Sequence, residues 1–166
     1  MKKLCAFALL VLFTASFAHA QVGGSKTPQA DERVRRALDQ AGMDYEVDSD
    51  ADFKIELDCK NNRTQVIWIK SATMEYDPFE IREVFSVSYK GANPPDARTL
   101  LDLMIQNGSR KIGGWQIEKW GNDYTVIFSV RVSATASGNE LKTLVELVKN
   151  ETDPMEIKLT NGKDDW

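Results

Sequence analysis

Histidine is nearly missing from this sequence. The single histidine, His19, lies in an N-terminal segment with the features of a secretory signal peptide, so the processed chain is expected to contain none. Catalysis by a serine or cysteine nucleophile paired with histidine is then excluded, and zinc sites lose their usual ligand. We expect no catalytic residue, no metal and no cofactor, and we interpret the protein as a non-enzyme.

Signatures of phosphate and nucleic-acid binding are also missing. Gly23-Gly24-Ser25-Lys26 lacks the Gly-Lys-Ser/Thr pattern of a phosphate loop, and no predicted strand precedes it. The chain has 21 basic and 25 acidic residues and no basic run; loss of Lys2 and Lys3 with the signal would change its net charge from −4 to −6. Because phosphate neutralisation dominates affinity for nucleic acids, we expect no nucleic-acid partner.

Cysteine is scarce, and this limits covalent cross-linking. Cys5 lies within the expected signal peptide, which leaves Cys59 as the only cysteine of the processed chain and excludes an intramolecular disulfide. Cys59 continues the alternation of Phe53, Ile55 and Leu57, which predicts that its side chain faces the core. A disulfide-linked dimer is the alternative.

The N-terminal apolar run is short for a membrane anchor. Residues 1–20 combine Lys2 and Lys3, an apolar stretch over residues 4–17 and the cleavage pattern Ala18-His19-Ala20. A membrane span needs roughly 20 apolar residues, so none is expected after cleavage. We predict a periplasmic or secreted bacterial protein with a signal peptide (1–20), a disordered tail (21–27) and one domain (28–166).

The periodicity of apolar residues predicts three helices and six strands. The first helix is expected to begin near Thr27 and end at Gly42, and the second to begin near Asn93 and end at Gly108. A capping box at Ser137-Gly138-Asn139-Glu140 opens the third helix, which Asp153-Pro154 restarts or kinks. Residues 71–78 are predicted to be irregular. The six expected strands cover residues 45–47, 53–57, 63–69, 81–89, 115–120 and 124–132.

The last two strands are expected to form a hairpin whose register follows from their alternation. A turn of two or four residues near Gly121-Asn122-Asp123 places Trp115 and Ile117 beside Phe128 and Val126 on the core face. The opposite, outer face then carries Trp120, and exposed aromatic surface often marks an interface. The predicted partner-binding residues are Trp120, Glu118, Thr125, Ile127, Arg131 and, on an inner strand, Trp68.

Two other interpretations of this region stay open. A terminal segment that includes Trp166 is an alternative cover for the outer face. A partner strand added to the free edge of the sheet is an alternative mode of protein binding.

Alternating acids at positions 44, 46, 48, 50 and 52 resemble a calcium-binding loop only superficially. With Asp48 as the first ligand, Phe53 stands where an EF-hand needs glycine and Cys59 where it needs a bidentate glutamate. We interpret the run as turns and a solvated strand face, with a weak calcium site as the alternative.

These elements predict an α+β domain with an antiparallel sheet of five or six strands and helices packed on one face. Their order resembles the YbjN-like family, often described as candidate regulators of sensory transduction, which shares the fold of type III secretion chaperones. The resemblance is carried by Leu100-Leu101, Asn107, Lys111-Ile112-Gly113 with Trp115, and by Asp153 and Glu156 in the closing helix. It implies this fold and no active site.

The functional expectation is a non-catalytic periplasmic module that binds proteins, as a chaperone-like or regulatory adaptor. Its partner is another protein or a second copy in a homodimer. The first alternative is a binder of cell-envelope glycan or another small ligand, with Trp120 as a stacking platform. The second is an enzyme of unknown type.

Overall fold

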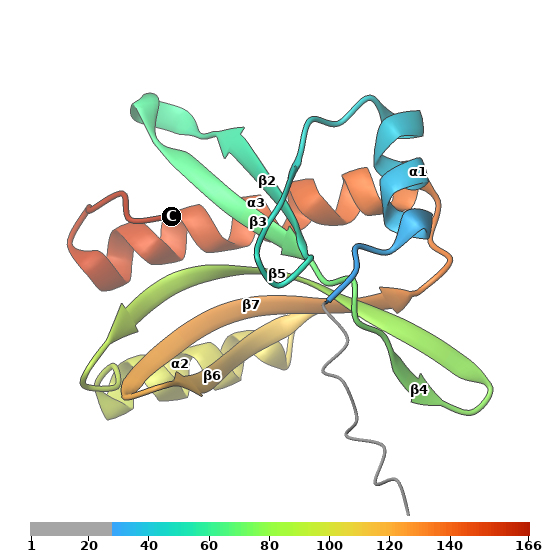
Figure 1. The fold of residues 1–166 in the computed structure, drawn as a ribbon. Coiled ribbons are helices and arrows are strands. Elements are labelled where there is room, and N and C mark those ends of the chain that lie inside the picture. The colour runs from blue at the N-terminus through green and yellow to red at the C-terminus, as the bar shows by residue number, and fades with distance from the viewer. Residues whose placement is uncertain (1–27) are drawn as a thin grey trace, which may run out of the picture.

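Residues 28–166 are described by a computed structural model, which shows one antiparallel sheet with three α-helices (Figure 1). The expected signal peptide and the tail over residues 21–27 lie outside the described residues. The elements in chain order are α1 (Glu32–Ala41), β1 (Glu46–Val47), β2 (Phe53–Asp58), the short 3₁₀ helix η1 (Lys60–Asn62), β3 (Thr64–Ile69), β4 (Met74–Tyr76), β5 (Phe79–Gly91), α2 (Ala97–Asn107), β6 (Gly114–Trp120), β7 (Asp123–Ser133) and α3 (Gly138–Thr160).

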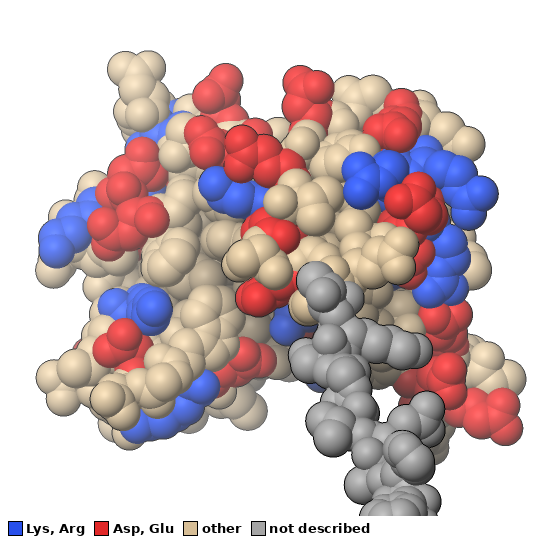
Figure 2. All heavy atoms as spheres, viewed as in Figure 1, with Lys and Arg blue, Asp and Glu red and all other residues tan. Residues whose placement is uncertain are grey.

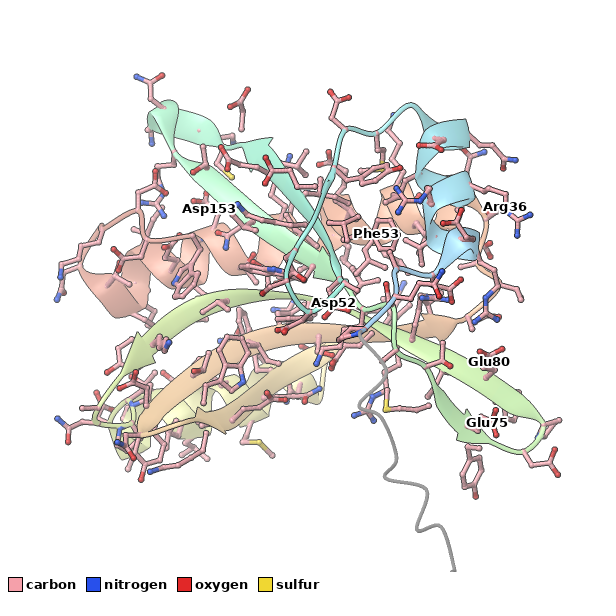
Figure 3. All side chains as sticks on the ribbon, in the orientation of Figure 1. Arg36, Asp52, Phe53, Glu75, Glu80 and Asp153 are labelled. Atoms are coloured by element: carbon pink, nitrogen blue, oxygen red, sulfur yellow. The ribbon has the colours of Figure 1, made fainter. Side chains whose placement is uncertain are left out.

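The sheet has seven strands in the order β1-β2-β3-β5-β7-β6, with β4 paired to the first part of β5. The predicted α+β class is confirmed. The sheet has one strand more than expected because residues 71–78, predicted to be irregular, contain β4. Its pairing with β5 makes a hairpin that projects from the body of the protein, and Glu75 and Glu80 lie opposite each other on its two strands (Figures 1 and 3).

The predicted register of the last hairpin is confirmed. Trp115 pairs with Phe128 and Ile117 pairs with Val126. Trp120 pairs with Asp123, so the turn has two residues, the shorter of the two lengths that the alternation allowed.

All three helices pack on one face of the sheet, as predicted. In Figure 1 the long helix α3 runs behind β2 and β3, which cross in front of it, and β5, β7 and β6 lie below it. One buried apolar cluster joins the helices to the inner side chains of the strands. It includes Val34 and Leu38 of α1, Leu103 of α2, Leu141, Leu144, Val145 and Val148 of α3, and Phe53, Ile67, Val84, Trp115, Phe128 and Val130 of the sheet.

The first two helices begin later than predicted. The carboxylate of Asp31 accepts the N–H of Arg33 at the start of α1, and Thr27, the predicted cap, lies outside the described residues. Asp96, rather than Asn93, accepts the N–H of Thr99 at the start of α2. In both segments an aspartate further along the chain provides the stronger cap, because its acceptor is charged.

Helix α3 has the predicted capping box, formed by Ser137 and Glu140. It continues through Pro154 as one helix, so of the two predicted effects of Asp153-Pro154, a restart or a kink, the restart does not occur; Thr152 and Met155 on either side are buried. Gly138 brings its start against α1, since a Cβ there would lie 2.2 Å from the carbonyl oxygen of Ala37. Within the described residues no helix has the length and apolar character needed to cross a membrane.

Candidate functional site

The face of the sheet opposite the helices carries a second apolar cluster. Phe85 and Val87 of β5 and Ile127 of β7 are buried there, with Trp68, Trp120 and Trp166 packed against them. Trp68 pairs with Phe85 across the sheet, so β3 and β5 place these two rings side by side. The predicted location of Trp120 on the outer face is therefore where the structure places it.

Four aromatic rings on this face surround a hollow. The rings of Trp68 and Phe85 are stacked with centroids 5.5 Å apart, Trp120 meets Phe85 edge-on at 6.2 Å, and Trp166 meets Trp68 edge-on at 6.4 Å. The hollow has a volume of about 310 Å³. We call it the aromatic cavity; its lining residues are Asp48, Asp50, Asp52, Trp68, Lys70, Phe85, Trp120 and Trp166.

One wall of the aromatic cavity comes from the C-terminal tail. After α3 the chain reverses at Asn161, which has a left-handed conformation. The buried guanidinium of Arg63 donates to the carbonyl of Lys163 at 2.8 Å, and the carboxylate of the buried Glu156 accepts the N–H of Asp165 at 2.7 Å. These contacts set the position of Trp166, which only partly covers the outer face, since all three tryptophans of the cluster keep some exposed surface.

The rim of the aromatic cavity is acidic. Asp48 accepts the N–H groups of Asp50 and Asp52, and Asp52 accepts the N–H of Ser71, so these acids shape the turn before β2. Burial, together with the charges of Asp48 and Asp50, raises the pKa of Asp52. Asp52 lies at the centre of the face in Figure 3, where Figure 2 shows acidic side chains together. None of the three pairs with lysine or arginine within residues 28–166.

Lys70 is the one basic residue that lines the aromatic cavity. Its ammonium lies 5.3 Å from the centroid of the Phe85 ring and 3.7 Å from a carboxylate oxygen of Glu83. Glu83 also accepts the hydroxyl of Ser129 on the same face. The charge of Lys70 also acts on Asp52. One ammonium therefore faces four carboxylates, those of Glu83 and of the three rim aspartates, and the surroundings of the aromatic cavity keep an excess of negative charge.

The structure brings together only part of the predicted binding set. Trp120 and Trp68 line the aromatic cavity, and Glu118 accepts the indole N–H of Trp120 at 2.7 Å. Thr125 and Ile127 lie on the same face but are 0% and 1% exposed, so they support it from below. Arg131 is exposed and lies further along β7, opposite Glu83, outside the cavity lining.

Several residues of this region were missed by the sequence interpretation. The acidic run was assigned to turns and a solvated strand face, but three of its members form the rim of the aromatic cavity. The sequence offered one clue, which is that it contains both an acidic run and tryptophans that the strand alternation did not assign to the core. Among the described residues no group of three or more histidine, cysteine, aspartate or glutamate side chains is placed to hold a metal ion.

A second surface lies where α2 meets the edge strand β6. It contains a hollow of about 390 Å³, which we call the edge groove; its lining residues are Leu100, Leu103, Met104, Trp115, Gln116 and Ile117. Apolar side chains of α2 continue beyond it, because Leu101, Met104 and Ile105 are 56%, 66% and 65% exposed. Such a cluster of exposed apolar side chains is typical of a protein-binding surface.

Strand β6 leaves main-chain groups of its outer edge open. Asn107 of α2 uses its side chain to accept the N–H and donate to the carbonyl of Trp115, at 2.7 and 3.1 Å. Those Trp115 groups therefore point away from β7, and by the alternation of an antiparallel pair so do those of Ile117 and Lys119. No strand within residues 28–166 pairs with this edge. The opposite edge strand, β1, has only two residues.

Cys59 does not face the core as predicted. Strand β2 ends at Asp58, and Cys59 caps η1, half-exposed, in a hollow that it shares with Lys149 and Asp153. The strand alternation therefore stops one residue before Cys59. Local burial, with a contribution from the charge of Asp153, raises the pKa of the thiol to about 11.

This pKa predicts slow alkylation of the native protein. The thiolate is the nucleophile, so the reaction of Cys59 with iodoacetamide should accelerate with pH up to about 11. In unfolded protein the rate should level off near the ordinary cysteine pKa of about 8.5. Mass spectrometry of quenched samples measures both profiles, and coincident profiles would contradict the assigned environment.

Comparisons with known proteins give a relation in fold. No protein-family model matches the sequence, and no curated protein matches it. Among solved structures, the crystal structure of YbjN from E. coli, described as a candidate transcription regulator, superposes with a TM-score of 0.50 and 13% identity, over 76% of this chain and 88% of that one. The domain is an open α+β sheet with helices on one face. Its fold is YbjN-like, as the resemblance implied.

Proposed function

We propose that this protein is a non-catalytic binding module that captures an extended segment of a partner protein as an added strand on β6. The observation that carries the proposal is the open main chain of Ile117 and Lys119 beside the edge groove. Main-chain hydrogen bonds give such a complex affinity, and pockets for alternate side chains give it specificity.

The geometry defines the partner segment. The inner side chains of a strand paired with β6 lie toward the edge groove, against Met104 and Ile117, and its outer side chains lie beside Glu118 and Trp120. The side chain of Asn107 already forms hydrogen bonds with the main-chain N–H and carbonyl of Trp115. The added strand is therefore limited to a few residues around Ile117 and Lys119. The partner segment is therefore short, with apolar residues at alternate positions.

A second copy of the chain fits this edge less well. A twofold-symmetric antiparallel pair that uses the open groups of Ile117 and Lys119 in both copies is centred on Glu118. It places Glu118 directly opposite Glu118 of the other copy, and like charges in that position destabilise a sheet. Charge thus favours a different protein over self-association.

The test uses a photo-crosslinking amino acid in the organism of origin, at position 119 and, as a control, at the exposed position 75 of the β4 hairpin. We expect a crosslink to a second protein from position 119 alone. Because the N–H of Lys119 points away from β7, Lys119→Pro should abolish capture of that protein without loss of a ladder hydrogen bond. Capture should also be lost with Met104→Glu and kept with Met74→Glu, a matched change on the β4 hairpin.

Two outcomes contradict the capture of another protein at β6. A crosslink only to a second copy of the chain would make β6 a self-association edge. Capture that survives both Lys119→Pro and Met104→Glu would show that the partner binds elsewhere.

We also propose that the protein acts after export. The cleavage pattern Ala18-His19-Ala20 followed by Gln21 supports this. The chain has more acidic than basic residues, which supports regulation through contacts with proteins rather than through binding to DNA. The intact mass of the native protein should correspond to a chain that begins at Gln21, with or without cyclisation. A mature species that keeps residues 1–20 would contradict export.

A further inference from the structure

We propose that the aromatic cavity binds a small organic cation with a methylated ammonium group, such as the trimethylammonium group of choline. This inference concerns the outer face of the sheet and is independent of strand addition at β6. It stands on three properties of the cavity: its ring walls, the excess of negative charge at its rim and its size.

The walls favour a cation with an apolar surface. A cation over the face of an aromatic ring is attracted by the negative face of the ring, most strongly with tryptophan, and cages of such rings are the common receptor for quaternary ammonium groups. Three tryptophans and Phe85 line the cavity. The Lys70 ammonium already lies 5.3 Å from the Phe85 centroid, so this environment accommodates a cation next to a ring within the same molecule.

The rim sets the sign of the ligand charge. Asp48, Asp50 and Asp52 form no ion pair with lysine or arginine in the described chain. Lys70, the one basic group of the lining, lies 3.7 Å from Glu83, so four carboxylates face a single ammonium. A cation between the rings and these carboxylates gains Coulombic attraction to three negative groups, and an anion is repelled. Because no group of acids in the described residues is arranged to hold a metal ion, the rim suits a diffuse organic charge better than a coordinated metal.

The size of the cavity limits the ligand. Its volume of about 310 Å³ lies at the low end of small-molecule pockets, which span about 300–1,000 Å³. Trp166 forms a wall from the C-terminal tail, which is held by Arg63, Glu156 and the main-chain N–H of Thr64, and its ring belongs to the outer cluster rather than to the helix-covered core. Removal of this ring should therefore open the cavity without disturbing the core.

The test is a titration of the full processed chain with choline, followed by tryptophan fluorescence. 3,3-Dimethylbutan-1-ol, which has the shape of choline without its charge, is the matched ligand. We expect saturable binding of choline at least about tenfold tighter than that of the uncharged analogue, as expected for one or two cation–π contacts and a favourable rim. Added salt should weaken choline binding, because the rim charges are exposed to screening.

Two variants locate the site, and a third serves as control. Trp166→Leu removes one wall and Asp50→Asn removes one rim charge; each should weaken choline binding several-fold, with an unchanged far-UV circular dichroism spectrum and melting temperature. Asp44→Asn makes the same charge change at an exposed residue outside the cavity and should leave binding unchanged. Equal binding of the uncharged analogue, no saturable signal with choline, or equal effects of Asp50→Asn and Asp44→Asn would each overturn the proposal.

Discussion

Replacement of Phe128 by alanine is expected to lower the free energy of unfolding by about 3–5 kcal/mol, the cost of a large cavity in a core. Phe128 is fully buried at the centre of β7 and meets Trp115 edge-on with centroids 5.1 Å apart. Arg110 also lies over its ring, at 5.3 Å from the centroid. Chemical denaturation followed by far-UV circular dichroism measures the change.

Trp120→Ala is the matched comparison on the other face of the same hairpin. Trp120 is only half-buried, so its loss should cost no more than about 1–2 kcal/mol, mainly the edge-on contact with Phe85 and partial burial. Equal destabilisation by the two changes would mean that the outer cluster contributes as much to the fold as the helix-covered core. The outer face would then be a structural element rather than a binding surface.

Arg82→Met is expected to be similarly damaging, about 3–5 kcal/mol, because it breaks a buried ion pair by removal of one partner. Arg82 is 1% exposed, and its guanidinium donates to Asp31 at 2.7 Å and to the main-chain carbonyls of Lys70 and Ala134 at 2.8 and 3.1 Å. It thereby joins the start of α1 to β5 and to the segment after β7. Arg98→Met, which removes an exposed arginine of α2, is the control and should leave stability nearly unchanged.

The same cluster predicts a dependence of stability on pH. Partial burial raises the pKa of Asp31, but hydrogen bonds from Arg33 and Arg82 more than offset this and hold the pKa well below its usual range. A depressed carboxyl pKa stabilises the fold above the unfolded value of about 3.9, and this contribution is lost as pH falls toward the folded pKa. In Arg82→Met the loss of stability below about pH 5 should be smaller than in the original chain. Denaturation at several pH values measures it, and parallel pH profiles would contradict the assigned role of Arg82.

The local features of the fold could be predicted from the sequence. The β6–β7 register followed from alternation and a tight turn, because a slip of one residue would move Trp115 and Phe128 to opposite faces. The capping box of α3 and the left-handed stop of α1 at Gly42 depend on neighbouring residues alone. Both therefore appear in the sequence as short motifs.

The strands were less predictable where their geometry is irregular or where they depend on a partner. Strict alternation along β5 would put Tyr89 on the same face as Phe85 and Val87, but a β-bulge between Val87 and Tyr89 turns Tyr89 toward the helix-covered core. Strand β4 has three exposed residues and exists through its pairing with β5. Neither the bulge in β5 nor the pairing of β4 leaves a periodic pattern in the sequence of the strand itself.

By itself the sequence determined the α+β class and the outward position of Trp120. Only the tertiary structure decided what surrounds Trp120. Arg63 fixes the C-terminal tail from a distance of about 100 residues along the chain, and this places Trp166 beside Trp68. The turn at Asp48 supplies the acidic rim, and Asn107 determines which edge groups of β6 stay open. The physical reason is that periodicity records which face a side chain takes, whereas a binding surface depends on which distant segment comes to lie beside that face.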